Sequence, residues 1–341
     1  MKRKVLLIGH YCATGGVSVH INRLATLLKK NFIVKVIDES RLIDNDGVTF
    51  NLRRKNIFKY INYIRKTDAI HIHTTVAIIR FFHILIGRLF FKRVVVTIHS
   101  LTTIKTAMDI FLLRNTLRFA HEIVVVSNEI NQILNIPKAR IIPAFLPPKI
   151  GSEPELPIEV KNLLESNKTK KIVISNAYRL NLFNKEDLYG TDLLIEVAKK
   201  LKNNKNKEIK IIFVITTLEV NKHLYDRYLN IINKEQLSEY ITIIPYPLSF
   251  VKLIQKCDLV VRATNTDGDA ITVREAIYFN KPVIASDVVV RPKKAILFKN
   301  RDYDDLYSKI IENINIPNIL IGQPLSEYKN IYKRLYLKEE I

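Results

Sequence analysis

The stretch CDLVVRATNTDGDAITVREAIYFNKPVIAS (residues 257–286) holds the clearest structural pattern in the sequence. The apolar runs at its two ends predict strands, and an amphipathic helix around Glu275 lies between them. The loop before that helix contains Asp267, Gly268 and Asp269. A strand, a glycine-bearing loop and a helix start bind anions through unpaired backbone N–H groups. Acidic side chains beside such a cradle suit sugar or ribose hydroxyls, so the stretch predicts a nucleotide-sugar site.

Short apolar runs alternate with helical patterns along the rest of the chain. Strands are predicted at 4–9, 33–38, 69–73, 93–99, 122–127, 171–177, 210–216, 241–246, 258–263, 282–286 and 295–298. Helices are predicted at 17–30, 56–66, 76–91, 106–120, 190–203, 221–235, 249–256 and 302–314. Apolar strands that alternate with helices indicate parallel βαβ units with right-handed crossovers. The expected fold class is therefore α/β, with two doubly wound parallel sheets.

A proline-rich segment between 146 and 171 interrupts this alternation and marks the domain junction. We therefore expect an N-terminal domain over residues 1–148 and a C-terminal domain over 149–325. Residues 326–341 are predicted to form a helix that packs back toward the N-terminal domain. Ligands of doubly wound sheets bind at the carboxyl ends of the strands, and here we expect them in a cleft between the domains.

The composition is that of a globular protein, since 48% of the 341 residues are hydrophobic and the mean hydropathy is +0.04. The two cysteines, Cys12 and Cys257, show no metal-binding spacing and no disulfide framework. No apolar run reaches the roughly 18–20 residues that span a bilayer, because Arg80 and Arg88 interrupt the nearest candidate. The N-terminus resembles a first strand rather than a signal peptide. We expect a cytoplasmic protein.

The net charge of +21 is concentrated in the first half of the chain, where residues 1–150 contain 24 Lys and Arg against 8 Asp and Glu. Such asymmetry indicates a polyanionic partner, either nucleic acid or an anionic membrane surface. Part of the excess also follows from a Lys-, Ile- and Asn-rich composition, as expected of an AT-rich genome. The sequence contains no tryptophan and no helix-turn-helix or zinc signature, so only charge supports nucleic-acid binding.

Several residues of the first half lie where a ligand would bind. Gly15 and Gly16 follow the first strand and open a helix, although a plain strand–helix connection explains them equally well because the GxGxxG spacing is missing. His99 ends a strand and is expected to point into the cleft, where it can donate to a hydroxyl or carry a proton. For His71 and His73, which alternate with isoleucines, a structural role is the simpler interpretation, with one of them able to face the cleft.

Two cations follow the first strand of the second half. Arg179 and Lys185 would place positive charge beside a diphosphate leaving group, since Arg supplies a planar fork and Lys a point charge. Solvated surface charge is an equally good interpretation in so basic a chain. For Asp267 and Asp269, the simpler alternative to sugar binding is capping of the helix that follows.

Taken in order, these segments resemble the retaining GT-B glycosyltransferases of the family 4, or group 1, type of bacterial surface-polysaccharide biosynthesis. The most specific segment, DGDAITVREAIYFNKPVIASD (267–287), aligns with the Glu-x7-Glu motif of that family. The softer matches are GGVSVHINRLATLL (15–28), DAIHIH (68–73), VVVTIHS (94–100), EIVVVS (122–127), IIPAF (141–145), NAYRL (176–180) and YGTDLLIEVAKKL (189–201). The landmarks cover nearly the whole chain.

The resemblance implies a role for each candidate residue. Glu275 takes the second Glu position and contacts the ribose, while Asp267 takes the first, beside the donor sugar; since this position holds Asp, either Asp267 or Asp269 performs its work. The implied catalytic residues are His99, Asp267 and Glu275. The implied donor-binding residues are Gly15, Gly16, Arg179, Lys185, Gly268, Asp269, Ala270, Ile271, Thr272 and Glu275. Tyr178 stands where the family usually has Gly before the Arg-Leu pair.

The resemblance also implies the reaction. A sugar passes from a nucleoside-diphosphate sugar, UDP-linked by family frequency, to a hydroxyl of a glycan or polyprenyl-diphosphate-linked acceptor in lipopolysaccharide or capsule synthesis. Because no glycosidase-like carboxylate pair is visible, we expect a same-face displacement in which the diphosphate helps to take the acceptor proton. No cofactor and no metal ion is expected. A GT-B epimerase or phosphorylase is the alternative, and a basic nucleic-acid-binding protein is the alternative without catalysis.

GT-B enzymes with lipid-linked acceptors dock their N-terminal domain on the membrane. The segment LRRKNIFKYINYIRK (52–66) is a basic amphipathic helix that suits anionic lipid. Its cations are Arg53, Arg54, Lys55, Lys59, Arg65 and Lys66. The segment 78–92 suits either the membrane interface or packing on the sheet of the N-terminal domain. We expect a peripheral protein on the inner face of the cytoplasmic membrane that does not bind nucleic acid.

Overall fold

The computed structural model describes residues 2–12, 15–40, 49–54, 56–101, 106–267, 270–316 and 325–337. The chain divides into two compact units. Unit 1 combines Met1–Pro147 with Pro324–Ile341, and unit 2 is Pro148–Gln323. The sequence analysis placed its boundaries at 148/149 and 325/326.

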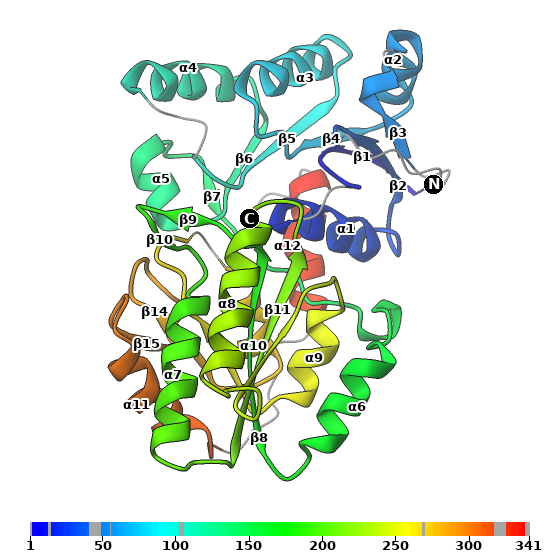
Figure 1. The fold of residues 1–341 in the computed structure, drawn as a ribbon. Helices are drawn as coiled ribbons and strands as arrows, with labels where there is room; N and C mark the ends of the chain where they lie inside the picture. Colours follow the sequence, from blue (N-terminus) through cyan, green and yellow to red (C-terminus); the bar gives the residue numbers. More distant parts are fainter. Residues whose placement is uncertain are drawn as a thin grey trace. The chain divides into compact units, whose positions relative to one another are not determined.

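Unit 1 is built on a seven-stranded sheet in which the pairings are parallel. The strand order is β3-β2-β1-β4-β5-β6-β7, so the order reverses between β1 and β4 (Figure 1). The strands are β1 (Lys4–Gly9), β2 (Ile33–Asp38), β3 (Thr49–Asn51), β4 (Ala69–Ile72), β5 (Arg93–Ile98), β6 (Glu122–Val125) and β7 (Arg140–Ile141). Their apolar side chains are buried on both faces, as in other parallel sheets.

Helices cover both faces of the unit 1 sheet (Figure 1). One face forms a core with α2, α3, α4 and α5 that includes Tyr60, Ile84 and Leu113. The other face packs against α1 and the C-terminal helix α12, which contribute Leu24 and Tyr336. The helices are α1 (Gly16–Leu28), α2 (Ile57–Arg65), α3 (Ala77–Leu89), α4 (Ala107–Leu117), α5 (Asn128–Leu134) and α12 (Leu325–Leu337), with a 3-10 turn at Leu52–Arg54. Unit 1 therefore needs the end of the chain to complete its core.

Unit 2 has a six-stranded parallel sheet in the order β12-β11-β8-β13-β14-β15. Its strands are β8 (Lys171–Arg179), β11 (Ile209–Thr217), β12 (Ile241–Ile244), β13 (Leu259–Arg262), β14 (Val283–Ser286) and β15 (Ile296–Phe298). A separate antiparallel hairpin pairs β9 (Leu182–Phe183) with β10 (Glu186–Asp187). The order again reverses, here between β8 and β13.

The unit 2 sheet is also covered on both faces (Figure 1). One core contains residues of α7, α8 and α11, and the other contains residues of α6, α9 and α10. The helices are α6 (Ile158–Ser166), α7 (Thr191–Asn203), α8 (Lys222–Lys234), α9 (Phe250–Lys256), α10 (Ile271–Tyr278) and α11 (Tyr303–Asn313), with a 3-10 turn at Ile150–Ser152. In a sheet that reverses its strand order, a crevice forms at the carboxyl ends of the two strands at the reversal.

The predicted fold class is confirmed, because both units are doubly wound α/β structures with parallel sheets. The elements that the sequence analysis missed are short: β3, β7 and α5 have two to seven residues, too few for a clear period. The hairpin of β9 and β10 was also missed. Its two-residue turn, Asn184 and Lys185, has positive φ values of 52° and 67°, as tight hairpin turns require.

Candidate functional site

The candidate site of unit 2 centres on a buried ion-pair cluster at the carboxyl ends of β13 and β14. Arg262, the last residue of β13, holds Asp267 with two hydrogen bonds, from Nε to Oδ2 at 3.0 Å and from Nη2 to Oδ1 at 3.2 Å. Arg291 donates from Nη1 to the same Oδ2 at 2.9 Å. We call these three residues the Asp267 clamp. All three side chains are largely buried, and only 2% of the Arg291 side chain is exposed.

Neighbouring hydroxyls complete the clamp. The hydroxyl of Thr264 donates to Asp267 Oδ2 at 3.0 Å, and Arg291 also contacts the backbone carbonyl of Ser286 from Nε at 3.1 Å. Burial opposes ionisation of Asp267, but the charges and hydrogen bonds of Arg262 and then Arg291 hold its pKa at about 2. The carboxylate is thus ionised at neutral pH. The N-cap residue of α10 is Ala270, which makes no side-chain capping hydrogen bond.

The helix α10 begins next to this clamp and presents polar side chains inward. Glu275 is buried on α10, with 5% of its surface exposed. Thr272, one turn earlier, donates from Oγ1 to Asn176 Oδ1 of β8 at 3.2 Å, which ties the helix start to the strand on the other side of the reversal. Ala270 and Ile271 lie at the helix start and are partly exposed. Gly268 and Asp269 lie outside the described residues.

A glycine brings α7 close to the same edge of the sheet. Gly190 precedes α7 with a φ of 71°, and a Cβ atom there would lie 2.3 Å from the carbonyl oxygen of Ala263. Asp187 accepts hydrogen bonds from the backbone N–H groups of Tyr189 and Gly190 at 2.7 and 2.9 Å. The ring of Tyr189 then lies 5.3 Å from the guanidinium carbon of Arg262. The YGTDLLIEVAKKL segment therefore has a physical role: Gly190 lets the start of α7 approach the strand end that carries the clamp.

The two predicted diphosphate ligands are exposed. Arg179 is the last residue of β8, and Lys185 lies at the tip of the β9–β10 hairpin. Both side chains are therefore accessible to a solvent-borne anion. Sequence analysis assigned no role to Arg262 or Arg291, although both belong to the stretch around the motif. An Arg at the end of an apolar strand, with Asp five residues later, is the signal that could have identified the pair.

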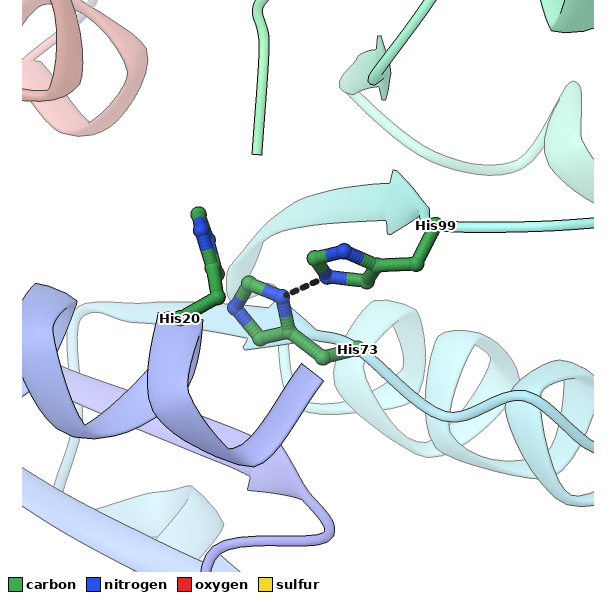
Figure 2. Close-up of side chains that lie close together, drawn as sticks. All are labelled: His20, His73 and His99. Atoms are coloured by element: carbon green, nitrogen blue, oxygen red, sulfur yellow. Dashed lines mark hydrogen bonds between the residues drawn. The ribbon is translucent and has the colours of Figure 1, made fainter. Parts of the chain in front are cut away.

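In unit 1, the predicted His99 belongs to a cluster of buried histidines at the carboxyl ends of β4 and β5 (Figure 2). His73 Nδ1 and His99 Nε2 lie 3.0 Å apart. The ring of His20, from α1, lies 5.2 Å from the ring of His73 and 4.9 Å from that of His99. His20 was not singled out in the sequence. Its position on the buried face of an amphipathic helix was the available signal.

His71 and His73 are both buried, so neither faces solvent. His71 bonds two hydroxyls, that of Tyr336 through Nδ1 at 2.6 Å and that of Thr97 through Nε2 at 2.7 Å. Burial lowers the pKa of His20 to about 4 and lowers the pKa values of His71, His73 and His99 well below their ordinary value. The rings are therefore neutral at pH 7. His99 is the partly exposed member.

The glycines near this cluster have different functions. Gly15 is the N-cap residue of α1 with a φ of 126°, and α1 begins at Gly16. A Cβ atom on Gly15 would meet no atom within 4 Å, so this glycine is required by its conformation rather than by packing. At Gly9 a Cβ atom would lie 3.0 Å from the His73 Cβ and 2.8 Å from the Ile21 Cδ1. Gly9 thus permits the close packing of β1, α1 and His73.

A second buried polar network lies nearby in unit 1 and was not predicted. Glu39 accepts from Thr74 Oγ1 at 3.0 Å and lies 3.0 Å from His83 Nε2, while His83 Nδ1 lies 2.7 Å from the Tyr60 hydroxyl. Burial lowers the pKa of Arg80 on the same helix to about 10, against the opposing charge of Glu39. This network shows that α3, with Arg80 and His83 on its buried face, packs on the sheet.

The outer face of α3 and its neighbour α4 is apolar. The two helices contact each other and lie side by side (Figure 1). Large exposed apolar side chains of this face, which we call the α3–α4 face, are Ile78, Phe82, Leu85, Leu89, Phe91, Met108, Phe111, Leu112 and Phe119. Phe91 is 96% exposed. Exposed apolar side chains in this number on two neighbouring helices make this face a candidate interaction surface.

The predicted membrane-binding cations lie on or beside α2. Arg53, Lys59, Arg65 and Lys66 are exposed, as a lipid contact requires. Lys55 and the side chain of Arg54 lie outside the described residues. The exposed Phe58 and Ile57 add apolar surface to the same helix. Within the described ranges, no helix combines the length and the apolar character needed to cross a membrane.

A cavity of about 880 Å³ opens elsewhere on unit 2, near the amino ends of β8 and β13. Lysines and three acidic residues line it, among them Lys171 and Asp258. Ligands of doubly wound sheets bind at the opposite, carboxyl ends of the strands. This cavity is therefore separate from the candidate site around the Asp267 clamp and Glu275.

The chain is similar in sequence to one protein family and in fold to several solved structures. Residues 160–329, about half of the chain, match the family model of the glycosyl transferases group 1. No curated protein matches the sequence. Among solved structures, HepE from Anabaena, in complex with UDP and glucose, is 15% identical with a TM-score of 0.67, and the match covers 98% of this chain and 95% of HepE.

Two further structures extend the comparison over the whole chain. A glycosyltransferase from Rickettsia africae is 15% identical with a TM-score of 0.70, and the match covers 99% of this chain and 94% of that one. Sucrose-phosphate synthase from Thermosynechococcus elongatus is 14% identical with a TM-score of 0.62, covering 99% and 97%. At these identities the likeness shows the fold alone. Residues 160–329 therefore form a group 1 glycosyltransferase domain, and the chain as a whole has the GT-B fold that its resemblance predicted.

Proposed function

We propose that the protein is a retaining glycosyltransferase that moves a sugar from a nucleoside-diphosphate sugar to an acceptor hydroxyl. The observation that carries this proposal is the buried Glu275 on α10, the helix that follows Asp267 in the chain, at the strand-order reversal within the family-matched segment. A buried carboxylate at a doubly wound nucleotide site suits a ribose diol, which donates two hydrogen bonds. HepE, which shares the fold, has been crystallised with UDP and with UDP-glucose, which favours a UDP-linked donor.

We propose that cations of unit 2 bind the diphosphate leaving group. Arg179 and Lys185 are exposed and can contact a diphosphate without loss of an existing buried ion pair. Their charge, with the N–H groups at the start of α10, would stabilise the diphosphate as it departs. Transfer is therefore proposed to proceed without a metal ion, with the diphosphate assisting removal of the acceptor proton. His99 is proposed to contact the donor sugar.

Thermal unfolding with candidate donors tests the donor class. We expect UDP to raise the melting temperature, since a ligand that binds the folded state stabilises it by mass action, and we expect DNA to have no effect. Donor hydrolysis across UDP-, GDP- and ADP-sugars then identifies the base. Stabilisation by DNA alone would instead support the nucleic-acid alternative. An epimer or a sugar phosphate formed without acceptor would support the epimerase or phosphorylase alternative.

Replacement of Glu275 tests the site. Glu275→Gln keeps the shape of the side chain but removes its charge, so we expect kcat/KM to fall by about 100-fold or more, the range of lost polar transition-state contacts. Lys281→Gln, at a residue that bonds the backbone carbonyl of Cys257, is the matched unit 2 control and should retain activity. Full activity of Glu275→Gln in folded protein would remove Glu275 from the mechanism.

We further propose that unit 1 docks on an anionic membrane and takes a lipid-linked glycan acceptor of surface-polysaccharide synthesis. Support comes from the α3–α4 face together with the exposed cations of α2, since apolar insertion and basic charge are the two requirements of interfacial binding.

Vesicle co-sedimentation tests this docking. The double change Leu89→Ser and Phe111→Ser should weaken binding to anionic vesicles by about tenfold or more, given the apolar area that would enter the interface. Val290→Ser, at an 80% exposed apolar residue of unit 2, is the control and should bind as the unchanged protein does. Equal binding of all three proteins, or no binding at low salt, would contradict the membrane proposal.

A further inference from the structure

Three imidazole side chains from different elements converge in unit 1. His20 comes from α1, His73 follows β4 and His99 follows β5 (Figure 2). One nitrogen from each ring can be chosen so that all three lie within 4.8 Å of one another. The strands β1, β4 and β5 are neighbours in the sheet, so the carboxyl ends of these strands bring the three rings together.

The hydrogen bonds of His20 determine which of its nitrogens has a lone pair. His20 Nδ1 lies 2.6 Å from the carbonyl oxygen of Ala144, which can only accept, so Nδ1 carries the proton. The lone pair of the neutral ring is therefore on Nε2. Among the described residues, this Nε2 is buried and has no hydrogen-bond partner. The same is true of Nε2 of His73.

Two buried nitrogens without partners in one small cluster call for a ligand. A buried polar atom without a partner destabilises the fold unless an ion, a water or another group satisfies it. His71 shows the alternative within the same cluster: it packs on His73 at a ring distance of 4.1 Å, but hydroxyls occupy both its nitrogens. A histidine can therefore pack in this cluster with hydrogen-bond partners on both of its ring nitrogens.

We propose that His20, His73 and His99 form a binding site for a single divalent transition-metal ion, with zinc as the best fit. Three neutral imidazoles with a fourth position left to water are a common ligand set for zinc, and imidazole also suits copper, nickel and cobalt. His99 is the partly exposed member of the three, so an ion would enter from its side. The proposal extends beyond glycosyl transfer and does not depend on it.

The geometry fits after a small closure of the rings. Zinc–nitrogen bonds of about 2.0–2.1 Å in a tetrahedron place ligand nitrogens roughly 3.4 Å apart. The present separations, up to 4.8 Å, require ring rotations: the unpartnered Nε2 of His73 would turn to the ion, and His99 Nε2 would exchange its 3.0 Å contact with His73 Nδ1 for a bond to the ion. The Ala144 carbonyl already orients His20 from behind, as carbonyls do for zinc-binding histidines. Because burial keeps the rings neutral at pH 7, no proton has to leave them.

A bound ion would connect α1 to the ends of β4 and β5. It would also occupy His99, so ion binding and the proposed contact of His99 with the donor sugar would exclude each other. Binding is measurable without any substrate. Failure of the metal site and failure of the glycosyltransferase proposal are therefore distinguishable.

Titration of the tag-free, chelator-treated full chain with zinc chloride tests the site. We expect one ion per chain by calorimetry, and cobalt(II) should give the visible absorption of a four- or five-coordinate nitrogen site. His20→Gln and His99→Gln should each weaken zinc binding by at least about tenfold, the lower end of what loss of even a supporting partner costs. His223→Gln, at an exposed histidine of α8, is the control and should bind unchanged.

Further measurements distinguish a true absence of zinc binding from misfolding of a variant and from zinc binding by another side chain. If His20→Gln does not fold by circular dichroism, His99→Gln and the cobalt spectrum of the unchanged chain decide the question. Cys12 is a partly exposed cysteine of the same unit that forms no disulfide, so Cys12→Ser should keep full affinity. No stoichiometric binding, a thiolate-type cobalt spectrum, or loss of binding only in Cys12→Ser would overturn the proposal.

Discussion

The histidine cluster of unit 1 and the Asp267 clamp of unit 2 lie at equivalent places, where the strand order of each sheet reverses, yet they differ in how far their polar atoms are paired. In the clamp, both oxygens of Asp267 accept hydrogen bonds, and Arg291 is held by Asp267 and by Ser286. In the histidine cluster, the Nε2 atoms of His20 and His73 have no partner among the described residues.

The difference follows from charge. A buried carboxylate or guanidinium is tolerated only when it is paired and hydrogen-bonded, because desolvation of an isolated ion is very costly. A neutral imidazole loses at most one hydrogen bond when a nitrogen is left without a partner. The clamp is therefore a completed, preorganised scaffold, whereas the histidine cluster retains the capacity to bind. Three predictions test this contrast.

Removal of one arginine from the clamp should have the largest effect. Arg291→Ala leaves Asp267 buried with one cation instead of two, so we expect a loss of about 3 kcal/mol in the free energy of unfolding of unit 2. Urea unfolding followed by circular dichroism measures it, since the chain has no Trp. Lys294→Ala, in the same loop but exposed, should change the free energy by less than about 0.5 kcal/mol. Equal losses in the two variants would show that the clamp is not a stabilising pair.

Lowering the pH should reduce the free energy of unfolding of unit 2 by a smaller amount. The pKa of Asp267 is about 2 in the folded chain, below its ordinary value of 3.8. A lowered folded-state pKa stabilises the fold above the ordinary pKa, and this contribution disappears as the pH falls toward 2. The difference corresponds to about 2 kcal/mol. The gap in unfolding free energy between the unchanged chain and Asp267→Asn should therefore shrink between pH 5 and pH 2, and a constant gap would contradict the ionised clamp.

Substitution in the histidine cluster should have the smallest effect. In the ion-free protein, His73→Leu exchanges a ring with one unpartnered nitrogen for an apolar side chain of similar size. We expect a change in unfolding free energy of no more than about 1 kcal/mol. His71→Leu is the matched comparison and should cost more, because both its nitrogens bond hydroxyls. A larger loss for His73→Leu than for His71→Leu would mean that the cluster is complete without a ligand.

Sequence periodicity was enough to predict the two parallel sheets, since buried strands and amphipathic helices leave clear patterns. It also predicted the helix around Glu275, which is α10. It did not reveal the Asp267 clamp, because the pairing of Asp267 with Arg291 depends on the path of the loop after β14. The histidine cluster required both the strand order, which brings β4 beside β5, and the packing of His20 on α1.

The tautomer of His20 was beyond any sequence pattern. It depends on one carbonyl, that of Ala144, more than a hundred residues away. For the same reason, the free nitrogens of the cluster became visible only with the hydrogen bonds of the folded chain. Sequence thus predicted candidate positions for ligands, whereas the hydrogen-bond partners of individual atoms depend on the folded chain.

The C-terminal helix α12 determines the order in which the two units can mature on the ribosome. Unit 2 is one continuous segment, so its sheet can close as soon as residues 148–323 have emerged. Unit 1 is synthesised first, but the face of its sheet beside α1 stays open to solvent until Tyr332, Leu335 and Tyr336 arrive. The half made earliest is thus the half that finishes last, and during translation its incomplete face is a natural substrate for chaperones.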